Sequence, residues 1–212
     1  MFPIGDDNSS RRLQPFVTYA LVIVNILFFL VELGGGDAFI DSWAFVPSRF
    51  MANPAGDFLT IFTSMFMHGG WLHIGGNMLY LWIFGDNVED RFGHVMFLIF
   101  YLACGIAATF TQLAFSLGSV IPNLGASGAI AGVLGAYIVL FPHRRVTVMI
   151  GYGVSQMPAL IVIGLWFVLQ VFSGIGSIAQ TADTGGIAFM AHVGGFIAGV
   201  VFAFIIRRNR VA

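Results

Sequence analysis

One serine in this chain of 212 residues has surroundings that favour chemistry. Ser127 lies in the segment Gly-Ala-Ser-Gly-Ala-Ile-Ala-Gly (residues 125–132), after an uncharged loop and at the start of an apolar helix. Apolar surroundings disfavour polar groups, and small neighbours leave the hydroxyl unshielded. Such a serine can act as a nucleophile if the chain supplies a base and hydrogen-bond donors for the developing negative charge.

The candidate base is His192, which lies inside another apolar segment. Ser127 precedes Pro142 by fifteen residues, and His192 precedes Arg207 by fifteen residues. At ~1.5 Å per helical residue, both lie roughly 22 Å from the polar end of their helix. A histidine inside a membrane helix is costly and usually functional. Imidazole titrates near neutral pH, which suits proton transfer to and from a hydroxyl.

Small residues recur around both candidates at helical spacing. The two sets are Ser127, Ala131 and Gly135, and His192, Gly195 and Gly199. Small residues at this spacing let two membrane helices approach closely, which a serine–histidine hydrogen bond requires. The same spacing is typical of ordinary helix packing, so that interpretation stays open.

His73 and Asn77 form a second polar pair. They are four residues apart and therefore share one face of a helix, where both can donate hydrogen bonds. They could equally serve as contacts between helices. His68 precedes His73 by five residues, a poor spacing for metal ligands, and no His-Glu-x-x-His segment occurs. A haem held by His73 and His192 is conceivable, but nothing else suggests redox chemistry, and we predict no metal and no cofactor.

The composition indicates a membrane protein. Hydrophobic residues make up 58% and charged residues 9%, with a mean hydropathy of +0.91. A soluble domain carries about 25% charged residues. The net charge of −1 gives no argument for nucleic-acid binding. The single cysteine, Cys104, excludes an intrachain disulfide, and the acidic N-terminus does not resemble a cleavable signal peptide.

The hydropathy pattern predicts an all-α membrane protein, a bundle of six transmembrane helices. The predicted spans are residues 16–33, 73–88, 95–116, 127–141, 157–172 and 187–206. Residues 37–66 alternate aromatic and charged residues and predict short helices at the membrane interface. The predicted organisation is a mobile cytoplasmic segment (1–14), a membrane domain (15–206) and a basic cytoplasmic tail (207–212).

The arginines predict the orientation. All nine basic residues are arginine, and only Arg49 falls on the outer side of the six-span arrangement. Because positive charge is retained in the cytoplasm, both termini are expected there. The predicted location is the cell membrane, as a multi-pass protein of a bacterial-type plasma membrane.

Three motifs resemble the rhomboid family of intramembrane serine proteases, over about residues 40 to 206. They are Gly125-Ala-Ser-Gly128, His73-Ile-Gly-Gly-Asn77 and Ala191-His-Val-Gly-Gly195, and residues 84–90 also look like the family's end of the second helix. The resemblance implies that Ser127 is the nucleophile and His192 the base, without a third carboxylate. His73, Asn77 and the Ser127 backbone N–H would hold the oxyanion.

The resemblance also implies substrates and backbone roles. The expected partners are single-span membrane proteins within the lipid bilayer, entering between the second and fifth helices. Gly125 and Gly128 would shape the backbone, and Gly128 would leave room for the scissile bond. A water-filled pocket is expected beside residues 117–126, capped by residues 174–186.

The sequence departs from the family pattern at two places. Some members carry an aromatic residue four positions after the serine, where this chain has Ala131. The partner that orients His192 is therefore not identified. Some members carry Trp-Arg in the first outer loop, whereas Trp43 is followed here by Ala44. We assign that loop no role beyond membrane contact.

Two other functions are compatible with a multi-pass protein. A non-catalytic relative would bind client helices without cutting them, but it should lack the nucleophile or the base. A small-solute transporter should show inverted repeats of broken helices, which this sequence does not.

Overall fold

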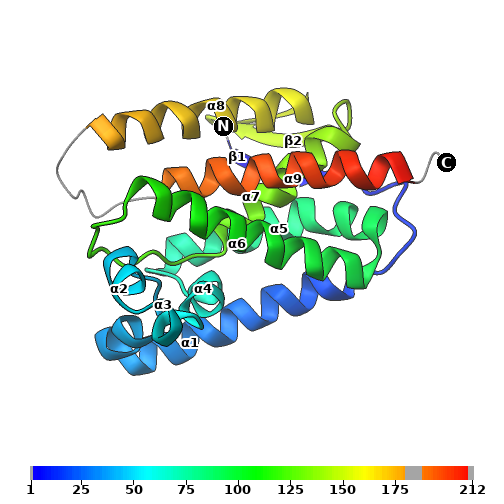
Figure 1. Ribbon diagram of the computed structural model, residues 1–212. Helices are drawn as coiled ribbons and strands as arrows, with labels where there is room; N and C mark the ends of the chain where they lie inside the picture. The colour runs from blue at the N-terminus through cyan, green and yellow to red at the C-terminus, as the bar shows by residue number, and fades with distance from the viewer. Residues whose placement is uncertain (1, 180–187, 210–212) are drawn as a thin grey trace.

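The computed structural model describes residues 2–179 and 188–209, most of them in long helices that run side by side (Figure 1). The long helices are α1 (Phe16–Trp43), α5 (Trp71–Phe92), α6 (His94–Phe115), α7 (Ser127–Leu140), α8 (Ala159–Ala179) and α9 (Phe189–Asn209). Four short turns lie between α1 and α5: α2 (Pro47–Ala52), α3 (Pro54–Asp57), α4 (Thr60–Thr63) and the 3-10 helix η1 (Ser64–Phe66). The short helices predicted within residues 37–66 are confirmed for residues 47–66, whereas residues 37–43 belong to α1.

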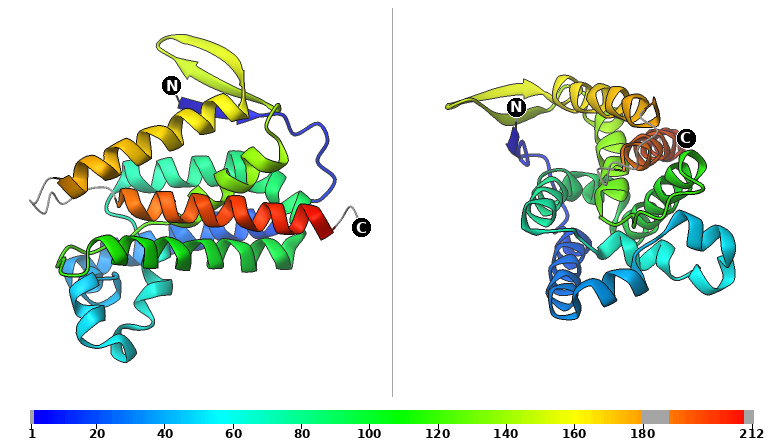
Figure 2. Two further views of the ribbon diagram at one scale, coloured as in Figure 1. Left: turned by 45° about the horizontal axis from the view of Figure 1, so that its top comes forward. Right: turned by 90° about the vertical axis from the view of Figure 1, so that its left-hand side faces the viewer.

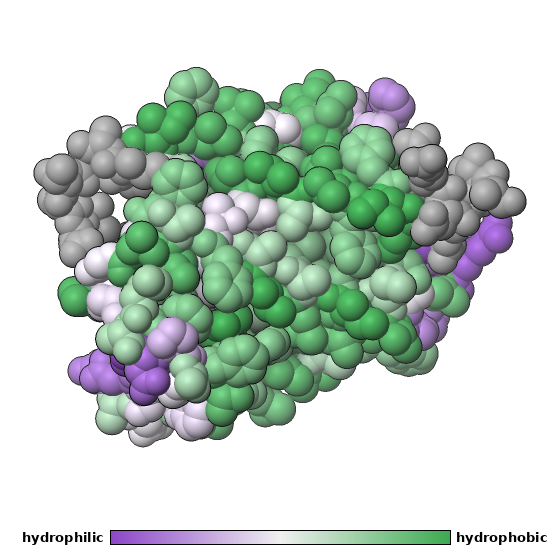
Figure 3. Space-filling model, viewed as in Figure 1, coloured by the Kyte–Doolittle hydropathy of each residue, from purple (hydrophilic) through white to green (hydrophobic). Residues whose placement is uncertain are grey.

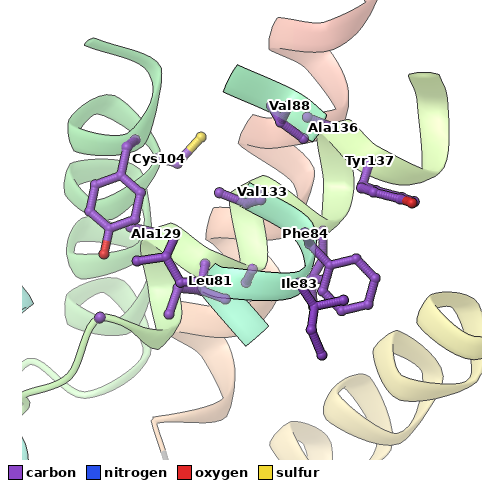
Figure 4. Packing of buried hydrophobic residues seen from close by; sticks show 14 of the residues in the cluster. Leu81, Ile83, Phe84, Val88, Cys104, Ala129, Val133, Ala136 and Tyr137 are labelled. Atoms are coloured by element: carbon purple, nitrogen blue, oxygen red, sulfur yellow. The ribbon is translucent and has the colours of Figure 1, made fainter. Parts of the chain in front are cut away.

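Helix α7 is the centre of the bundle. Every residue from Gly128 to Tyr137 is buried, and the other long helices surround it in the end-on view (Figure 2). Figure 4 shows side chains of α5, α6 and α7 meeting in this core. The Phe84 and Tyr137 rings pack edge to face, with centroids 5.1 Å apart. A helix that is apolar all round must be buried in this way or face lipid.

Helices α7 and α9 approach each other through glycine. A Cβ atom on Gly195 would collide with the carbonyl oxygen of Gly128, and one on Gly199 would collide with that of Gly132. Gly135 likewise faces the backbone of Phe196. The close helix contact predicted from residues 135, 195 and 199 is therefore confirmed. It is the packing that lipid-embedded helices favour, because dispersion contacts replace the hydrophobic effect there.

The surface matches a protein embedded in a membrane. Helices α1, α6, α8 and α9 are long and apolar enough to cross a bilayer by length and composition. Figure 3 shows apolar side chains covering the middle of one face, with polar side chains gathered toward its two ends. Helix α1 begins at the end of the bundle where α9 finishes (Figure 1). The six-span count and the cytoplasmic location of the termini stay predictions.

The expectation of an all-α protein is wrong in one region. An antiparallel sheet of order β1-β2-β3 contains β1 (Phe2–Asp6), β2 (Arg145–Ile150) and β3 (Gly153–Pro158). Val146 and Val148 alternate with more exposed residues on β2, as a half-buried strand requires. The hairpin turns at Gly151, whose φ of 58° favours glycine.

The N-terminal segment also differs from the mobile, polar stretch that the sequence predicts. Its residues 2–6 form β1, which pairs with β2 from Phe2↔Met149 to Asp6↔Val146. Arg11 then forms an ion pair with Asp86 of α5. These partners lie far away in the sequence, which is why a local pattern does not reveal them.

Several helix ends differ from the predicted spans. Helix α1 passes the predicted stop at residues 34–36 and continues to Trp43, with a break at Gly36, where φ is 56° and ψ is −149°. Helix α8 runs to Ala179 instead of residue 172. Residue 187, residues 180–186 of the expected capping loop and residues 210–212 of the tail lie outside the described residues.

Candidate active site

The structure brings Ser127 and His192 together. Ser127 is the first residue of α7, and His192 lies in the first turn of α9. The Ser127 Oγ atom is 2.7 Å from the His192 Nε2 atom. His192 is 7% exposed, so its ring is shielded on most sides. This distance is within the hydrogen-bond range that a nucleophile and its base require.

Backbone pairing fixes the segment that leads into Ser127. Phe45 and Asn123 exchange two backbone hydrogen bonds, of 3.2 and 2.7 Å, and thereby join the connection between α1 and α2 to residues 117–126. The Gly125 N–H donates to the Ser64 carbonyl at 2.9 Å. An uncharged loop without regular structure therefore still holds the start of α7 in one place.

Gly125 lies at a position that excludes a side chain. Its φ is 129°, and a Cβ atom there would lie 2.9 Å from His73 Nε2. Glycine at this position lets the His73 ring approach the segment before Ser127. A Cβ on Gly128 would collide with Ala108 of α6, so Gly128 permits close helix packing. Its predicted second role, leaving room for a substrate backbone, stays a prediction.

His73 and Asn77 of α5 face the same space as the serine and histidine. A cleft of about 750 Å³ is lined by His73, Asn77, Ser127 and His192, with residues 121–124 at its side. Asn77 is 9% exposed, and its Nδ2 atom has no hydrogen-bond partner among the described residues. A buried donor without a partner is costly unless another molecule accepts its hydrogen bond. Both residues line the cleft beside Ser127, and their role as oxyanion donors stays a prediction.

His68, whose spacing from His73 is poor for a metal ligand, packs against His73 instead. The His68 ring is fully buried and packs edge-on against the His73 ring, with centroids 5.2 Å apart. The His68 backbone N–H donates to Glu32 Oε2 of α1 at 2.9 Å. Among the described residues, no group of three or more His, Cys, Asp or Glu side chains could hold a metal ion.

Two side chains of α8 hold the His192 ring, which the sequence analysis did not find. Gln170 Oε1 is 2.7 Å from His192 Nδ1. The Trp166 ring lies beside the imidazole, with centroids 5.8 Å apart and an interplanar angle of 39°. Trp166 therefore supplies an aromatic contact to the imidazole, although residue 131 is alanine. A signal was available, because Gln170 is the one long polar side chain within residues 159–179.

The geometry defines a class of site: a serine and a histidine joined in an apolar bundle, beside a cleft where the Asn77 amide has no partner among the described residues. Comparison with known proteins agrees with this class. A family model for the rhomboid domain matches residues 55–209. The chain belongs to the rhomboid family.

Named relatives span several kinds of organism. Rhomboid protease GluP of Bacillus subtilis is 33% identical over 88% of this chain and 34% of its own length. The mitochondrial rhomboid protein 1 of Saccharomyces cerevisiae is 28% identical over 91% of this chain and 54% of its own length. A mitochondrial presenilin-associated rhomboid-like protein of Bos taurus is 34% identical over 47% of this chain and 28% of its own length. The chain thus spans between 28% and 54% of the length of these relatives.

Proposed function

We propose that this chain is an intramembrane serine endopeptidase that cleaves single-span membrane proteins within or near their transmembrane helix. The observation that carries the proposal is the 2.7 Å contact between Ser127 Oγ and His192 Nε2 at the edge of the cleft. The similarity to a relative named as a rhomboid protease supports the same class of reaction.

The reaction divides into two steps on Ser127. In the first, Ser127 Oγ attacks the peptide carbonyl carbon while His192 Nε2 accepts the hydroxyl proton. The C–N bond then breaks, the proton passes from Nε2 to the leaving amine, and an acyl ester remains. In the second step water attacks the ester, His192 takes the water proton, and Ser127 leaves with that proton. The two steps together consume one water molecule for each peptide bond, and neither step is an oxidation or a reduction.

Donors around the cleft suit the oxyanion of each tetrahedral intermediate. Asn77 offers its unpartnered Nδ2 group, and His73 lies beside it on α5. Because the first backbone hydrogen bond of α7 runs from the Ile130 N–H to the Ala126 carbonyl, the N–H groups of the residues just before Ile130 have no acceptor within the helix. The positive end of the α7 dipole adds to this stabilisation. Losing one such donor typically lowers the rate ~10²–10³-fold.

The shape of the site supports entry of a substrate helix between α5 and α8. A second cavity of about 240 Å³ adjoins the cleft and is lined by Tyr80 of α5, Leu134 of α7 and Trp166 of α8. A transmembrane segment entering there would have to unwind beside Ser127 to expose a peptide bond. The proposed location is a bacterial-type plasma membrane, although two of the relatives are named as mitochondrial.

The test is cleavage and labelling in liposomes. Wild-type protein should cleave a single-span model substrate and react with a fluorophosphonate at Ser127. Ser127→Ala and His192→Ala should abolish cleavage, while Ser116→Ala should leave it unchanged, because the Ser116 hydroxyl only bonds the Gln112 carbonyl. Undiminished cleavage by Ser127→Ala would exclude the proposal.

The same experiment separates the alternative, a non-catalytic member of the family that binds client helices. That protein would retain the substrate in the bilayer without cutting it, and its Ser127 would not react with the fluorophosphonate. The hydrogen bond between Ser127 and His192 favours the enzyme, since a binding protein gains nothing from an activated hydroxyl.

A further inference from the structure

His192 has a neutral amide as its second hydrogen-bond partner. The Gln170 Oε1 atom is 2.7 Å from Nδ1, and Ser127 Oγ is 2.7 Å from Nε2. An amide oxygen only accepts hydrogen bonds, so Nδ1 must carry the proton in this arrangement. The lone pair of the neutral imidazole is then on Nε2, where it faces the serine hydroxyl. The opposite tautomer would direct an N–H at Ser127 and could not accept its proton.

The surroundings of the ring fix its plane as well as its tautomer. Gln170 and Trp166 are four residues apart and therefore lie on one face of α8. Trp166 packs beside the imidazole, and Phe189 packs against it edge-on, with centroids 6.5 Å apart. Among the described residues, no carboxylate is hydrogen-bonded to His192. Gln170 thus occupies the place that a carboxylate takes in a catalytic triad.

We propose that Gln170 is a positioning residue, which holds His192 in the Nδ1–H tautomer with Nε2 directed at Ser127. The role rests on the proposed function, because it matters for catalysis only if Ser127 is the nucleophile. Glutamine supplies the acceptor without placing a negative charge inside the apolar bundle, where a carboxylate is expensive. It orients the base and, as a dipole, stabilises the imidazolium that forms during the reaction.

The test compares Gln170→Leu, which removes the acceptor, with Gln170→Glu, which keeps it. Gln156→Leu is the matched control. Gln156 is an exposed residue of β3 and does not line the cleft. The first readout is the rate of fluorophosphonate labelling between pH 5 and pH 9 in liposomes. Gln170→Leu should be labelled at least tenfold more slowly, which is part of the ~10²–10⁴-fold that a positioned base contributes. Gln156→Leu should be labelled like the wild type.

Gln170→Glu should recover most of the labelling and shift the acidic limb of its pH profile to higher pH. A carboxylate beside Nδ1 favours the imidazolium and so delays its deprotonation. His73 and Tyr80 of α5 are the other titratable side chains that line these cavities with His192, and both are unchanged in this comparison. A folded Gln170→Glu protein without any recovery would overturn the proposal.

The second readout observes the tautomer directly. ¹⁵N spectra of histidine-labelled protein, assigned with His192→Ala, should show a protonated Nδ1 in the wild type and a mixture in Gln170→Leu. An unchanged tautomer together with an unchanged labelling rate in Gln170→Leu would overturn the role of Gln170 alone. Wild-type protein that cannot be labelled at Ser127 would instead overturn the proposed function, and the spectra would still report on Gln170 and His192.

Discussion

Helices α5 and α7 carry polar side chains at both ends, and the two groups differ in their hydrogen bonding. One group lines the cleft, and the other forms a cluster of polar residues at the opposite end of the helices. Near their starts, α5 carries His73 and Asn77, and α7 carries Ser127. Near their ends they contribute to the polar cluster, which consists of Asp6, Arg11, Asp86, Asn87, Glu89, Tyr137 and Arg144. Both groups combine buried and half-buried side chains, so the difference between them concerns hydrogen bonding and not burial.

In the polar cluster, the hydrogen-bond partners are other residues of the protein. Glu89 is fully buried and accepts hydrogen bonds from the Val17 N–H at 2.9 Å and from the Thr18 N–H and hydroxyl at 2.7 Å each. Its other contact is His94 Nδ1 at 2.6 Å. Tyr137 donates to Asp6 at 2.6 Å. Buried polar groups that are paired so completely join helices together.

In the cleft, by contrast, hydrogen bonding between described residues is incomplete. Asn77 Nδ2 has no partner among the described residues, and the Ser127 hydroxyl bonds His192, whose other ring nitrogen bonds Gln170. The comparison teaches that burial of a polar group does not by itself indicate catalysis. A group whose hydrogen bonds are complete supports the fold, and a group with an unused donor beside a cleft is available to a ligand.

The largest expected effect is on the reaction, from Asn77→Ala. Loss of the unpartnered donor should lower the cleavage rate about 10²–10³-fold, because the oxyanion loses one hydrogen bond. The melting temperature should hardly change, since Nδ2 bonds nothing within the described structure. Cleavage assays in liposomes and thermal unfolding in detergent measure the two quantities.

Asn87→Ala is the matched control on the same helix. The Asn87 side chain bonds Asp6 at 2.8 Å and also contacts Asn8 and Arg144. Its removal should lower the free energy of unfolding by about 1–2 kcal/mol and leave the rate per folded molecule unchanged. If the two asparagine variants showed the same balance of activity and stability, the distinction between the cleft and the polar cluster would not hold.

The next effect is on stability, from Glu89→Ala. Several donors of α1 would lose their acceptor inside the protein, at about 1–3 kcal/mol for each group left unsatisfied. We expect a loss of at least about 3 kcal/mol in the free energy of unfolding, measured by denaturant titration in mixed micelles. Glu89→Gln keeps one acceptor oxygen and should lose less. Equal stability of Glu89→Ala and the wild type would contradict a joining role.

The smallest effect is on pH dependence, through Asp6 of β1. Burial, opposed in part by the Tyr137 hydroxyl and reinforced by the nearby Asp86 charge, raises the pKa of Asp6 to about 7. The unfolded chain releases this proton near its ordinary pKa of 3.8, so the folded state binds it more tightly. The stability from protonated Asp6 is complete below pH 3.8 and is lost as the pH rises through 7.

Asp6→Asn tests this direction. Its amide oxygen can still accept from Tyr137, but the residue no longer titrates. The melting temperature of the wild type should fall between pH 5 and pH 8 more steeply than that of Asp6→Asn. A steeper fall in the variant would reverse the assigned direction.

Features with a local sequence signal were predictable. Ser127 begins α7 where the Gly/Ala segment predicts, and the depth count for His192 places both residues at one level. The glycine spacing predicts the close contact of α7 and α9, because helical periodicity determines which residues share a face. A serine and a histidine inside apolar helices attract attention for a physical reason, since lipid offers them no partner.

Features that depend on distant partners were not predictable. Strand β1 pairs with β2, whose sequence lies about 140 residues away, and neither strand is long enough to give a clear alternating pattern. The contact of Gln170 with His192 depends on how α8 rotates against α9, which helical spacing alone does not determine. The sequence shows a glutamine at position 170, but it does not show which neighbouring helix the side chain faces.

The two hydrogen bonds of His192 lead to helices that are held with unequal firmness. Helix α9 packs closely against α7 through glycine backbone contacts. In α8, by contrast, only 22% of the residues in the apolar segment Ala159–Gly176 are buried, the lowest share among the four candidate spans of the described residues. Any sideways displacement of α8 therefore stretches the bond to Gln170 before the bond to Ser127. Under the proposed function, the position of α8 would therefore determine how well His192 is oriented toward Ser127.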